Sequence, residues 1–172
     1  LQFHHTHPPV ARRAPNGNTT LGIKTATSPM QANELQQLRR RMRRARRALT
    51  PQQQQAAAHA LARHVAAHPA FQRSRRIGLY LAVRGEMAVD ELIERAWDSG
   101  KQVYLPVLMP YRHNRMWFAP HRPGQALNTN RFGIPEPDVA VREMVNPRAL
   151  DLVLVPLVAF DTDGHRLGMG GG

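Results

Sequence analysis

Residues 76–109 read "RIGLYLAVRGEMAVDELIERAWDSGKQVYLPVLM", and this run determines the fold class of the chain. It starts with an apolar run of strand length, 76–83, and ends with another, 102–109. Between the two runs the apolar side chains follow helical spacing, and "DSGK" then closes the helix. Two strands joined by a helix within about 30 residues predict a β-α-β unit with parallel strands.

Two helices are predicted before this unit. From 31 to 49 the apolar residues recur three and four positions apart and form one stripe. Thr50 and Pro51 then restart a helix, as N-cap and first helical residue, and Pro69 ends it. The stripe of the first helix consists of Leu35, Leu38, Met42, Ala45 and Leu49.

After the β-α-β unit, residues 115–121 are predicted to pair antiparallel with the second strand, and "NPRAL" (146–150) to form a short helix. The run 151–160 is the most apolar in the chain and predicts a strand buried on both faces. The expected fold class is α/β: a three-layer α/β/α domain with a mostly parallel sheet, two N-terminal helices and its final elements missing. Ligands are expected at the carboxyl ends of the strands.

Composition limits the function classes. The 172 residues fit one domain and carry a net charge of +12. The absence of cysteine excludes disulfides and thiolate metal sites, and no apolar run reaches the roughly 18 residues of a membrane span. We therefore expect a cytoplasmic protein without membrane contact. Residues 1–29 lack helical and strand periodicity, which predicts a disordered or non-native leader before a domain of residues 30–172.

The basic run "LRRRMRRARRAL" (38–49) indicates an anionic partner, because its arginines outnumber the acids that could pair with them nearby. Arg39 and Arg43 lie four residues apart, on one helix face, where both could bind one polyphosphate. A solvated helix face and a nucleic-acid-binding module are the alternatives. An RNA-binding surface would interleave aromatic residues with the basic ones, and residues 31–50 contain none.

A glycine-rich stretch, "DTDGHRLGMGGG" (161–172), follows the most apolar strand. Glycine lets main-chain N–H groups approach an anion closely, and Arg166 can add a charged fork to the same phosphate. The spacing matches neither the dinucleotide fingerprint nor a Walker loop. A plain surface loop is the alternative to a phosphate site.

Two further candidates come from strand ends and loops. Glu86 follows the first strand of the β-α-β unit, where its carboxylate could accept hydrogen bonds from the N–H groups of a heterocycle; a charge at a helix start is the alternative. Phe132, in the loop "NRFGIPEP", lacks core periodicity and could contact a ligand. The aromatic residues of 116–118 have strand spacing, which favours a core role. Zinc and hydrolase motifs are absent from the sequence.

Together these motifs resemble the 5-formyltetrahydrofolate cyclo-ligase (5,10-methenyltetrahydrofolate synthetase) family. The similarity runs from about residue 34 to the end, through "LRRRMRRARRAL-TPQQQ", "IGLYLAVRGEM", "GKQVYLPV", "FGIPEP" and "DLVLVPLVAFDTDGHRLGMGGG". The resemblance implies an ATP- and Mg²⁺-dependent ligase of folate one-carbon metabolism. In such an enzyme ATP phosphorylates the formyl oxygen of 5-formyltetrahydrofolate, N10 attacks the activated carbon, and phosphate leaves to give the 5,10-methenyl product.

The resemblance also implies site residues, position by position. Leu81, Glu86 and Phe132 match folate-contacting positions, with Glu86 facing the pterin. Leu35 stands where the family often has a Lys that binds ATP. The remaining ATP-binding positions are Arg39, Arg43, Arg166, Leu167, Gly168, Met169, Gly170, Gly171 and Gly172.

In the family the glycines are followed by two aromatic residues and the aspartate that binds Mg²⁺, and these positions would fall after Gly172. We therefore expect a fragment with impaired activity, no metal ligand within the chain, and a non-catalytic scaffold as a further alternative. The implied partners are 5-formyltetrahydrofolate, possibly in its polyglutamylated form, and ATP, with a monomer as the expected state and no nucleic-acid partner.

Overall fold

The computed structural model describes residues 2–5, 29–108, 116–130 and 133–169. The helices are α1 (Pro29–Arg47), α2 (Pro51–Ala67), α3 (Pro69–Arg73) and α4 (Asp90–Asp98), with the short 3₁₀ helices η1 (Val141–Glu143) and η2 (Pro147–Ala149). The strands are β1 (Gln2–His5), β2 (Arg76–Gly78), β3 (Gln102–Leu108), β4 (Met116–His121), β5 (Leu127–Thr129), β6 (Pro135–Pro137), β7 (Leu152–Val155), β8 (Ala159–Phe160) and β9 (Arg166–Leu167).

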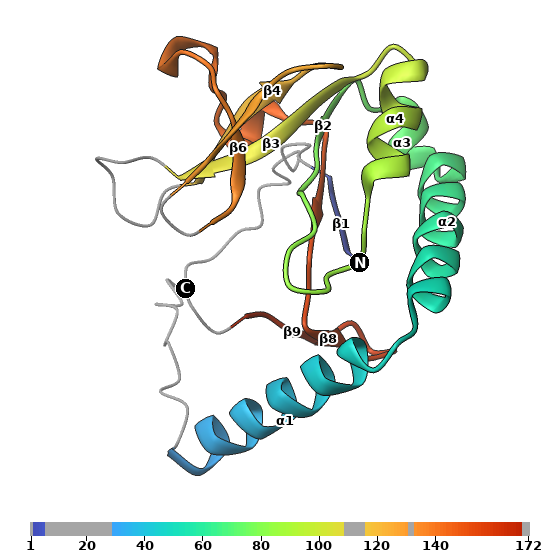
Figure 1. Ribbon diagram of the computed structural model, residues 1–172, viewed down its shortest axis with the longest axis vertical. Coiled ribbons are helices and arrows are strands. Elements are labelled where there is room, and N and C mark those ends of the chain that lie inside the picture. The colour runs from blue at the N-terminus through green and yellow to red at the C-terminus, as the bar shows by residue number, and fades with distance from the viewer. Residues whose placement is uncertain (1, 6–28, 109–115, 131–132, 170–172) are drawn as a thin grey trace, which may run out of the picture.

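The main sheet has the strand order β1-β7-β2-β3-β4 (Figure 1). Its three central strands are parallel, with Ile77 of β2 opposite both Val103 of β3 and Leu152 of β7. Both edge strands are antiparallel: β4 to β3, and β1 to β7. The predicted β-α-β unit and the antiparallel strand after it are confirmed. β5 and β6 form a separate two-stranded sheet, as do β8 and β9.

Helices α2, α3 and α4 cover one face of this sheet (Figure 1). Ile77 of β2 and Leu79, just after it, belong to the same buried cluster as Val65 of α2, Phe71 of α3 and Leu92 of α4. The three helices therefore share one apolar core with the central strands, as a β-α-β unit requires to bury its apolar face.

The opposite face carries a smaller cluster formed by Tyr104, Phe118 and Leu150. Gly78 lies in this face, where a Cβ would be 2.9 Å from both Leu150 Cδ1 and Phe118 Cε1. On this face the described residues place the 3₁₀ helix η2 beside β4. The predicted α/β fold, with N-terminal helices and a mostly parallel sheet, is confirmed.

The predicted ends of two strands are wrong, because an apolar sequence indicates that residues are buried and does not indicate whether they pair in a sheet. The predicted strand 76–83 leaves the sheet after Gly78, although Leu79 and Tyr80 remain buried. The predicted strand 151–160 ends at Val155, before Pro156, which has no N–H to donate. Its second half is not buried on both faces, since Phe160 is 68% exposed.

Several elements were not predicted: α3, η1, β1, β5, β6 and β9. Pro69 ends α2 but also begins α3, because the side chain of His68 accepts a hydrogen bond from the Ala70 N–H and acts as N-cap. The strand β1 lies within residues 1–29, where the sequence pattern predicts no strand, and it pairs with β7. By contrast, the predicted cap of α2 is confirmed: Thr50 is the N-cap, Pro51 is the first helical residue, and Thr50 and Gln53 form a capping box around it.

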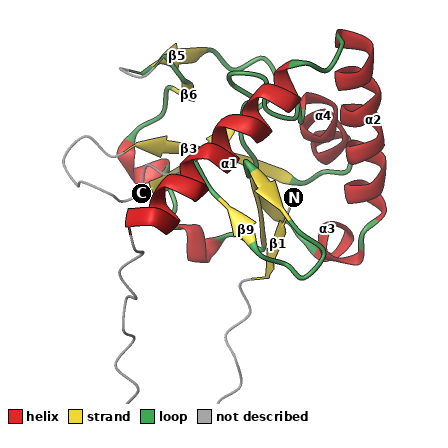
Figure 2. Ribbon diagram, turned by 90° about the horizontal axis from the view of Figure 1, so that it is seen from below, coloured by secondary structure: helices red, strands yellow, loops and turns green. Residues whose placement is uncertain are grey.

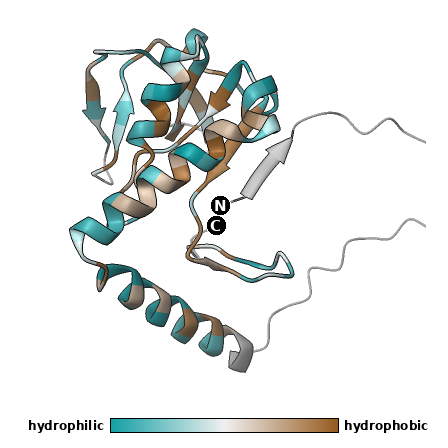
Figure 3. Ribbon diagram, turned by 90° about the vertical axis from the view of Figure 1, so that its right-hand side faces the viewer, coloured by the Kyte–Doolittle hydropathy of each residue, from teal (hydrophilic) through white to brown (hydrophobic). Residues whose placement is uncertain are grey.

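Helix α1 lies apart from the helix–sheet body. Figures 1 and 2 show it crossing beneath the sheet, near β9, and Figure 3 shows it beside the β8–β9 hairpin. Because β2, β3 and β7 run parallel, their carboxyl ends share one edge, and β7 leads from that edge into the hairpin. Among the described residues, no helix is both long enough and apolar enough to span a membrane.

Candidate functional site

A cleft of about 920 Å³ opens between the C-terminal part of α1, α2, the turn after β2, and the segment 156–160. Its walls are mainly apolar, with Leu49, Leu61 and Phe160 among them. Its polar side chains include Arg46, Tyr80, Glu86, His59 and Glu91. A mostly apolar cavity with a few convergent polar groups is the usual form of a small-molecule site.

Glu86 is half-buried in this cleft and closes the turn Val83–Glu86 in two ways. Its N–H donates to the Val83 carbonyl oxygen at 3.1 Å, and its carboxylate accepts from the Val83 N–H at 3.3 Å. Both central residues have positive φ, 52° at Arg84 and 76° at Gly85, as in a type I′ turn. The turn therefore holds the Glu86 carboxylate in the segment that follows β2, and the sequence predicts a ligand contact for this residue.

Tyr80 shares the cleft with Glu86. Its side chain is 5% exposed, and its hydroxyl donates to the Met87 carbonyl oxygen at 2.9 Å. The pKa of Tyr80 is raised to about 12, mainly by burial and further by the negative charge of Glu86, while the positive charge of Arg46 acts in the opposite direction. Arg46 and Glu86 thus act on the same phenol from two different elements.

Arg39, Arg43 and Arg46 define one side of α1, which we call its inner face, and the first two contact the glycine-rich segment. The Arg39 Nε–H donates to the Gly168 carbonyl oxygen at 3.0 Å, and an Arg43 Nη2–H donates to the Met169 carbonyl oxygen at 3.0 Å. Each bond uses one nitrogen of a guanidinium that carries five N–H donors. Two cations beside a glycine-rich main chain form an arrangement suited to a polyphosphate.

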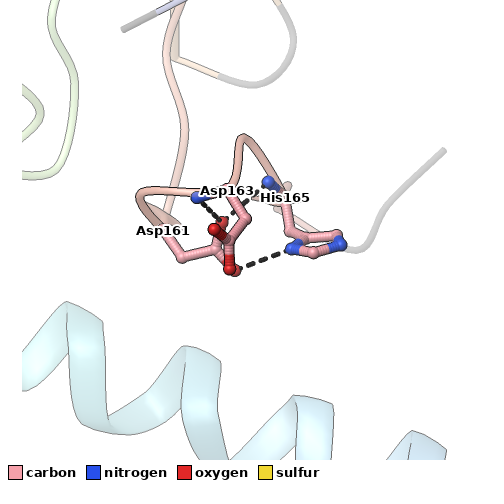
Figure 4. Close-up of side chains that lie close together, drawn as sticks. All are labelled: Asp161, Asp163 and His165. Atoms are coloured by element: carbon pink, nitrogen blue, oxygen red, sulfur yellow. Dashed lines mark hydrogen bonds and ion pairs between the residues drawn. The ribbon is translucent and has the colours of Figure 1, made fainter.

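The β8–β9 hairpin gathers Asp161, Asp163 and His165, whose potential ligand atoms lie within 4.8 Å of one another (Figure 4). The Asp161 carboxylate accepts the Asp163 N–H at 3.0 Å and the His165 N–H at 2.8 Å, and lies 2.8 Å from His165 Nδ1. The His165 N–H is the main reason why the pKa of Asp161 falls below its usual range. Because the cluster is exposed and its central carboxylate already binds its own turn, we assign no Mg²⁺ site to it.

The structure separates the sequence-predicted residues into two groups. Glu86 lines the cleft, whereas Arg39 and Arg43 meet Gly168 and Met169 further along α1. Three predicted residues lie elsewhere or are exposed: Leu81 is half-buried against the core cluster, Leu35 is 37% exposed, and Arg166 is exposed in β9. Leu167 is buried at 9% exposure. Phe132 and Gly170–Gly172 lie outside the described residues.

Sequence reasoning missed Arg46 and Tyr80. Arg46 was one of seven arginines in the basic run, and only its spacing of seven from Arg39 marks it as a member of the inner face. Tyr80 was counted as strand. Four arginines of the run are exposed on the other side of α1: Arg40, Arg41, Arg44 and Arg47.

Comparisons with known proteins identify the family of the chain. The model of the 5-formyltetrahydrofolate cyclo-ligase family matches residues 31–172. The 5-formyltetrahydrofolate cyclo-ligase of Escherichia coli (strain K12) is 41% identical over 131 residues, which are 76% of this chain and 72% of that protein. The Haemophilus influenzae protein of the same name is 37% identical over 143 residues, 83% of this chain and 76% of that protein.

Solved structures agree as well. The 5,10-methenyltetrahydrofolate synthetase of Aquifex aeolicus superposes with a TM-score of 0.69 at 29% identity, over 80% of this chain and 68% of that one. The Mycoplasma pneumoniae synthetase, at 20% identity and a TM-score of 0.60 over 80% of this chain and 72% of that one, shares the fold. From the family match and these relatives we conclude that the chain belongs to the 5-formyltetrahydrofolate cyclo-ligase family.

Proposed function

We propose that this protein is a 5-formyltetrahydrofolate cyclo-ligase of folate one-carbon metabolism, which uses ATP to convert 5-formyltetrahydrofolate into the 5,10-methenyl form. One observation carries the proposal. Arg39 and Arg43 of α1 bind the glycine-rich segment, while Glu86 lies in the turn that follows β2 and lines the cleft. These positions thus combine groups suited to a polyphosphate with a carboxylate suited to a heterocycle.

The proposed reaction has two steps. The formyl oxygen attacks the terminal phosphorus of ATP, and ADP leaves with the electron pair of the broken P–O bond. This step turns the formyl oxygen, otherwise a poor leaving group, into part of a phosphate that can leave. N10 of the folate then attacks the activated formyl carbon and closes the ring, the N10 proton passes to water, and phosphate leaves with the former formyl oxygen. Because phosphoryl transfer needs alignment and charge stabilisation more than covalent help, the protein acts mainly by positioning.

Each residue has a corresponding role in the proposal. Arg39 and Arg43 hold the phosphates against the glycine-rich segment, with Arg166 and residues 167–172 completing that side. Glu86 accepts hydrogen bonds from the pterin N–H groups. Leu81 and Phe132 contact the folate, and Leu35 adds an apolar contact on the ATP side. Mg²⁺ bound to the nucleotide would neutralise charge on the transferred phosphoryl group.

The finer expectations belong to the same proposal: a monomer in the cytoplasm, a folate substrate with or without a polyglutamate tail, and impaired turnover. The last is tested by comparing the rate of this chain with that of the Escherichia coli relative. Binding of a nucleic acid to the exposed arginines of α1 (Arg40, Arg41, Arg44 and Arg47) is the alternative. The affinity of such binding would fall steeply as the salt concentration is raised.

The test follows the absorbance of the methenyl product while the chain is incubated with ATP and 5-formyltetrahydrofolate. We expect ATP-dependent turnover that falls at least about tenfold in Glu86→Ala, the loss expected when one charged contact is removed. Glu94→Ala is the matched control, because Glu94 is an exposed carboxylate on α4. No turnover in the folded chain, or equal turnover in the two variants, would contradict the proposal.

A further inference from the structure

Arg46 is the third arginine of the inner face of α1, three residues after Arg43 and seven after Arg39. Each of the three donates to a main-chain carbonyl far away in the sequence. Arg39 and Arg43 bind the glycine-rich segment, whereas an Arg46 Nη2–H binds the carbonyl oxygen of Arg84 at 3.1 Å. One rigid helix face therefore touches both the proposed nucleotide side and the turn that carries Glu86.

The turn that Arg46 binds is conformationally unusual. Arg84 has a φ of 52°, a left-handed conformation that non-glycine residues adopt rarely and retain when their surroundings hold them. The Arg46 bond ends on the carbonyl of this same residue. It is the bond that the structure shows between α1 and the turn, and a charged donor makes it stronger than a neutral hydrogen bond.

The surroundings of Arg46 favour a fixed guanidinium. The side chain is half-buried in the cleft wall, and its Nε is buried without a hydrogen-bond partner among the described residues. Buried donors of this kind are rare and call for an explanation beyond stability. The opposing effects of Arg46 and Glu86 on the pKa of Tyr80 show that both charges act at one point of the cleft.

From these contacts we propose that Arg46 is a positioning residue: it holds the Val83–Glu86 turn against α1 and so places the Glu86 carboxylate for the folate substrate. The inference rests on the proposed function. It adds that α1 serves both substrates, through Arg39 and Arg43 for the nucleotide and through Arg46 for the folate.

The test compares Arg46→Met, which keeps length but removes the donors, with Arg46→Lys and with Arg47→Met. Arg47 is exposed on the next position of the same helix, so it controls for loss of one charge from α1. In Arg46→Met we expect the KM for 5-formyltetrahydrofolate to rise about tenfold while the KM for ATP changes less than about twofold. Arg46→Lys should recover part of the loss, because an ammonium can still donate to the Arg84 carbonyl.

A purely structural role would instead change both KM values and the Tm together, and this result would overturn the inference. So would an Arg46→Met variant with the kinetics of Arg47→Met.

A second readout is independent of activity. Amide hydrogen exchange at Glu86, whose N–H closes the turn, should be about tenfold faster in Arg46→Met than in the wild type or in Arg47→Met. If the wild type shows no turnover, the proposed function fails, and the exchange rate alone then decides whether Arg46 holds the turn. Unchanged exchange would overturn the inference in either case.

Discussion

Helices α1 and α2 are neighbours in sequence, yet different forces hold them. α2 buries Ala62 and Val65 in the core cluster, at 1% and 2% exposure. α1 leaves Leu35 at 37% exposure, as the turn after it leaves Leu49 at 40%, and α1 is linked to the rest of the chain by arginine–carbonyl hydrogen bonds. Burial gives α2 a role in stability, whereas hydrogen bonds of exposed groups contribute little stability and instead fix donors in place.

The largest difference should appear when one leucine is truncated in α1 and another in α4, which shares the core cluster with α2. Leu92 of α4 is fully buried in the core cluster, so Leu92→Ala should lower the free energy of unfolding by about 2–5 kcal/mol. Leu35→Ala in α1 should cost less than about 1 kcal/mol, because the side chain is already partly in water. Urea denaturation followed by circular dichroism measures both.

Equal losses of stability in the two variants would show that α1 belongs to the cooperative core. The contrast between α1 and the helices of the core cluster would then be wrong. A change in the urea m-value of Leu35→Ala alone would indicate that α1 unfolds separately from the body.

A smaller effect is expected from adding one methyl group within the sheet. In Gly78→Ala the new Cβ would be 2.9 Å from Leu150 and Phe118, so these side chains must shift, at a cost of about 1–3 kcal/mol. Gly168→Ala, beside α1, should leave stability nearly unchanged, because nothing lies within 4 Å of the added Cβ. Thermal unfolding of the two variants measures the difference, and a Gly168→Ala variant that is the less stable of the pair would contradict it.

The same contrast explains what the sequence could and could not predict. The body follows from local patterns: helical spacing at 89–97 and the cap at Thr50 each specify one element. The ends of β2 and β7 could not be placed, because residues such as Leu79 are buried whether or not they are paired in the sheet. Among the residues of the candidate site, the sequence predicts Glu86 from its position after an apolar run of strand length.

The role of Arg46 could not be predicted, because it depends on a contact between residues 38 positions apart. In a run of seven arginines, composition does not distinguish those that face the chain from those that face water. The distinction comes from the tertiary position of α1, which its contacts with Gly168, Met169 and Arg84 help to define.

The smallest expected effect is a pH dependence at the junction of the two regions. The pKa of Tyr80 is about 12 in the folded state, against about 10 for an unperturbed tyrosine. Between these values the folded chain binds more protons than the unfolded one, so the stability contribution is complete below about pH 10 and is lost as pH rises through about 12. The urea midpoint should therefore fall more steeply with alkaline pH in the wild type than in Tyr80→Phe.

Arg46 makes this prediction a test of how the two regions meet. Its charge on α1 lowers the pKa of a phenol that the body buries. Arg46→Met should therefore raise the pKa of Tyr80 further, so that the alkaline loss of stability, which still begins at about pH 10, becomes larger and extends to higher pH. Arg47→Met, on the exposed side, should leave this profile unchanged. An identical alkaline profile in Arg46→Met and the wild type would mean that α1 does not rest against the turn in solution. The site would then be built from the body alone, with α1 joining it only when a polyphosphate is bound.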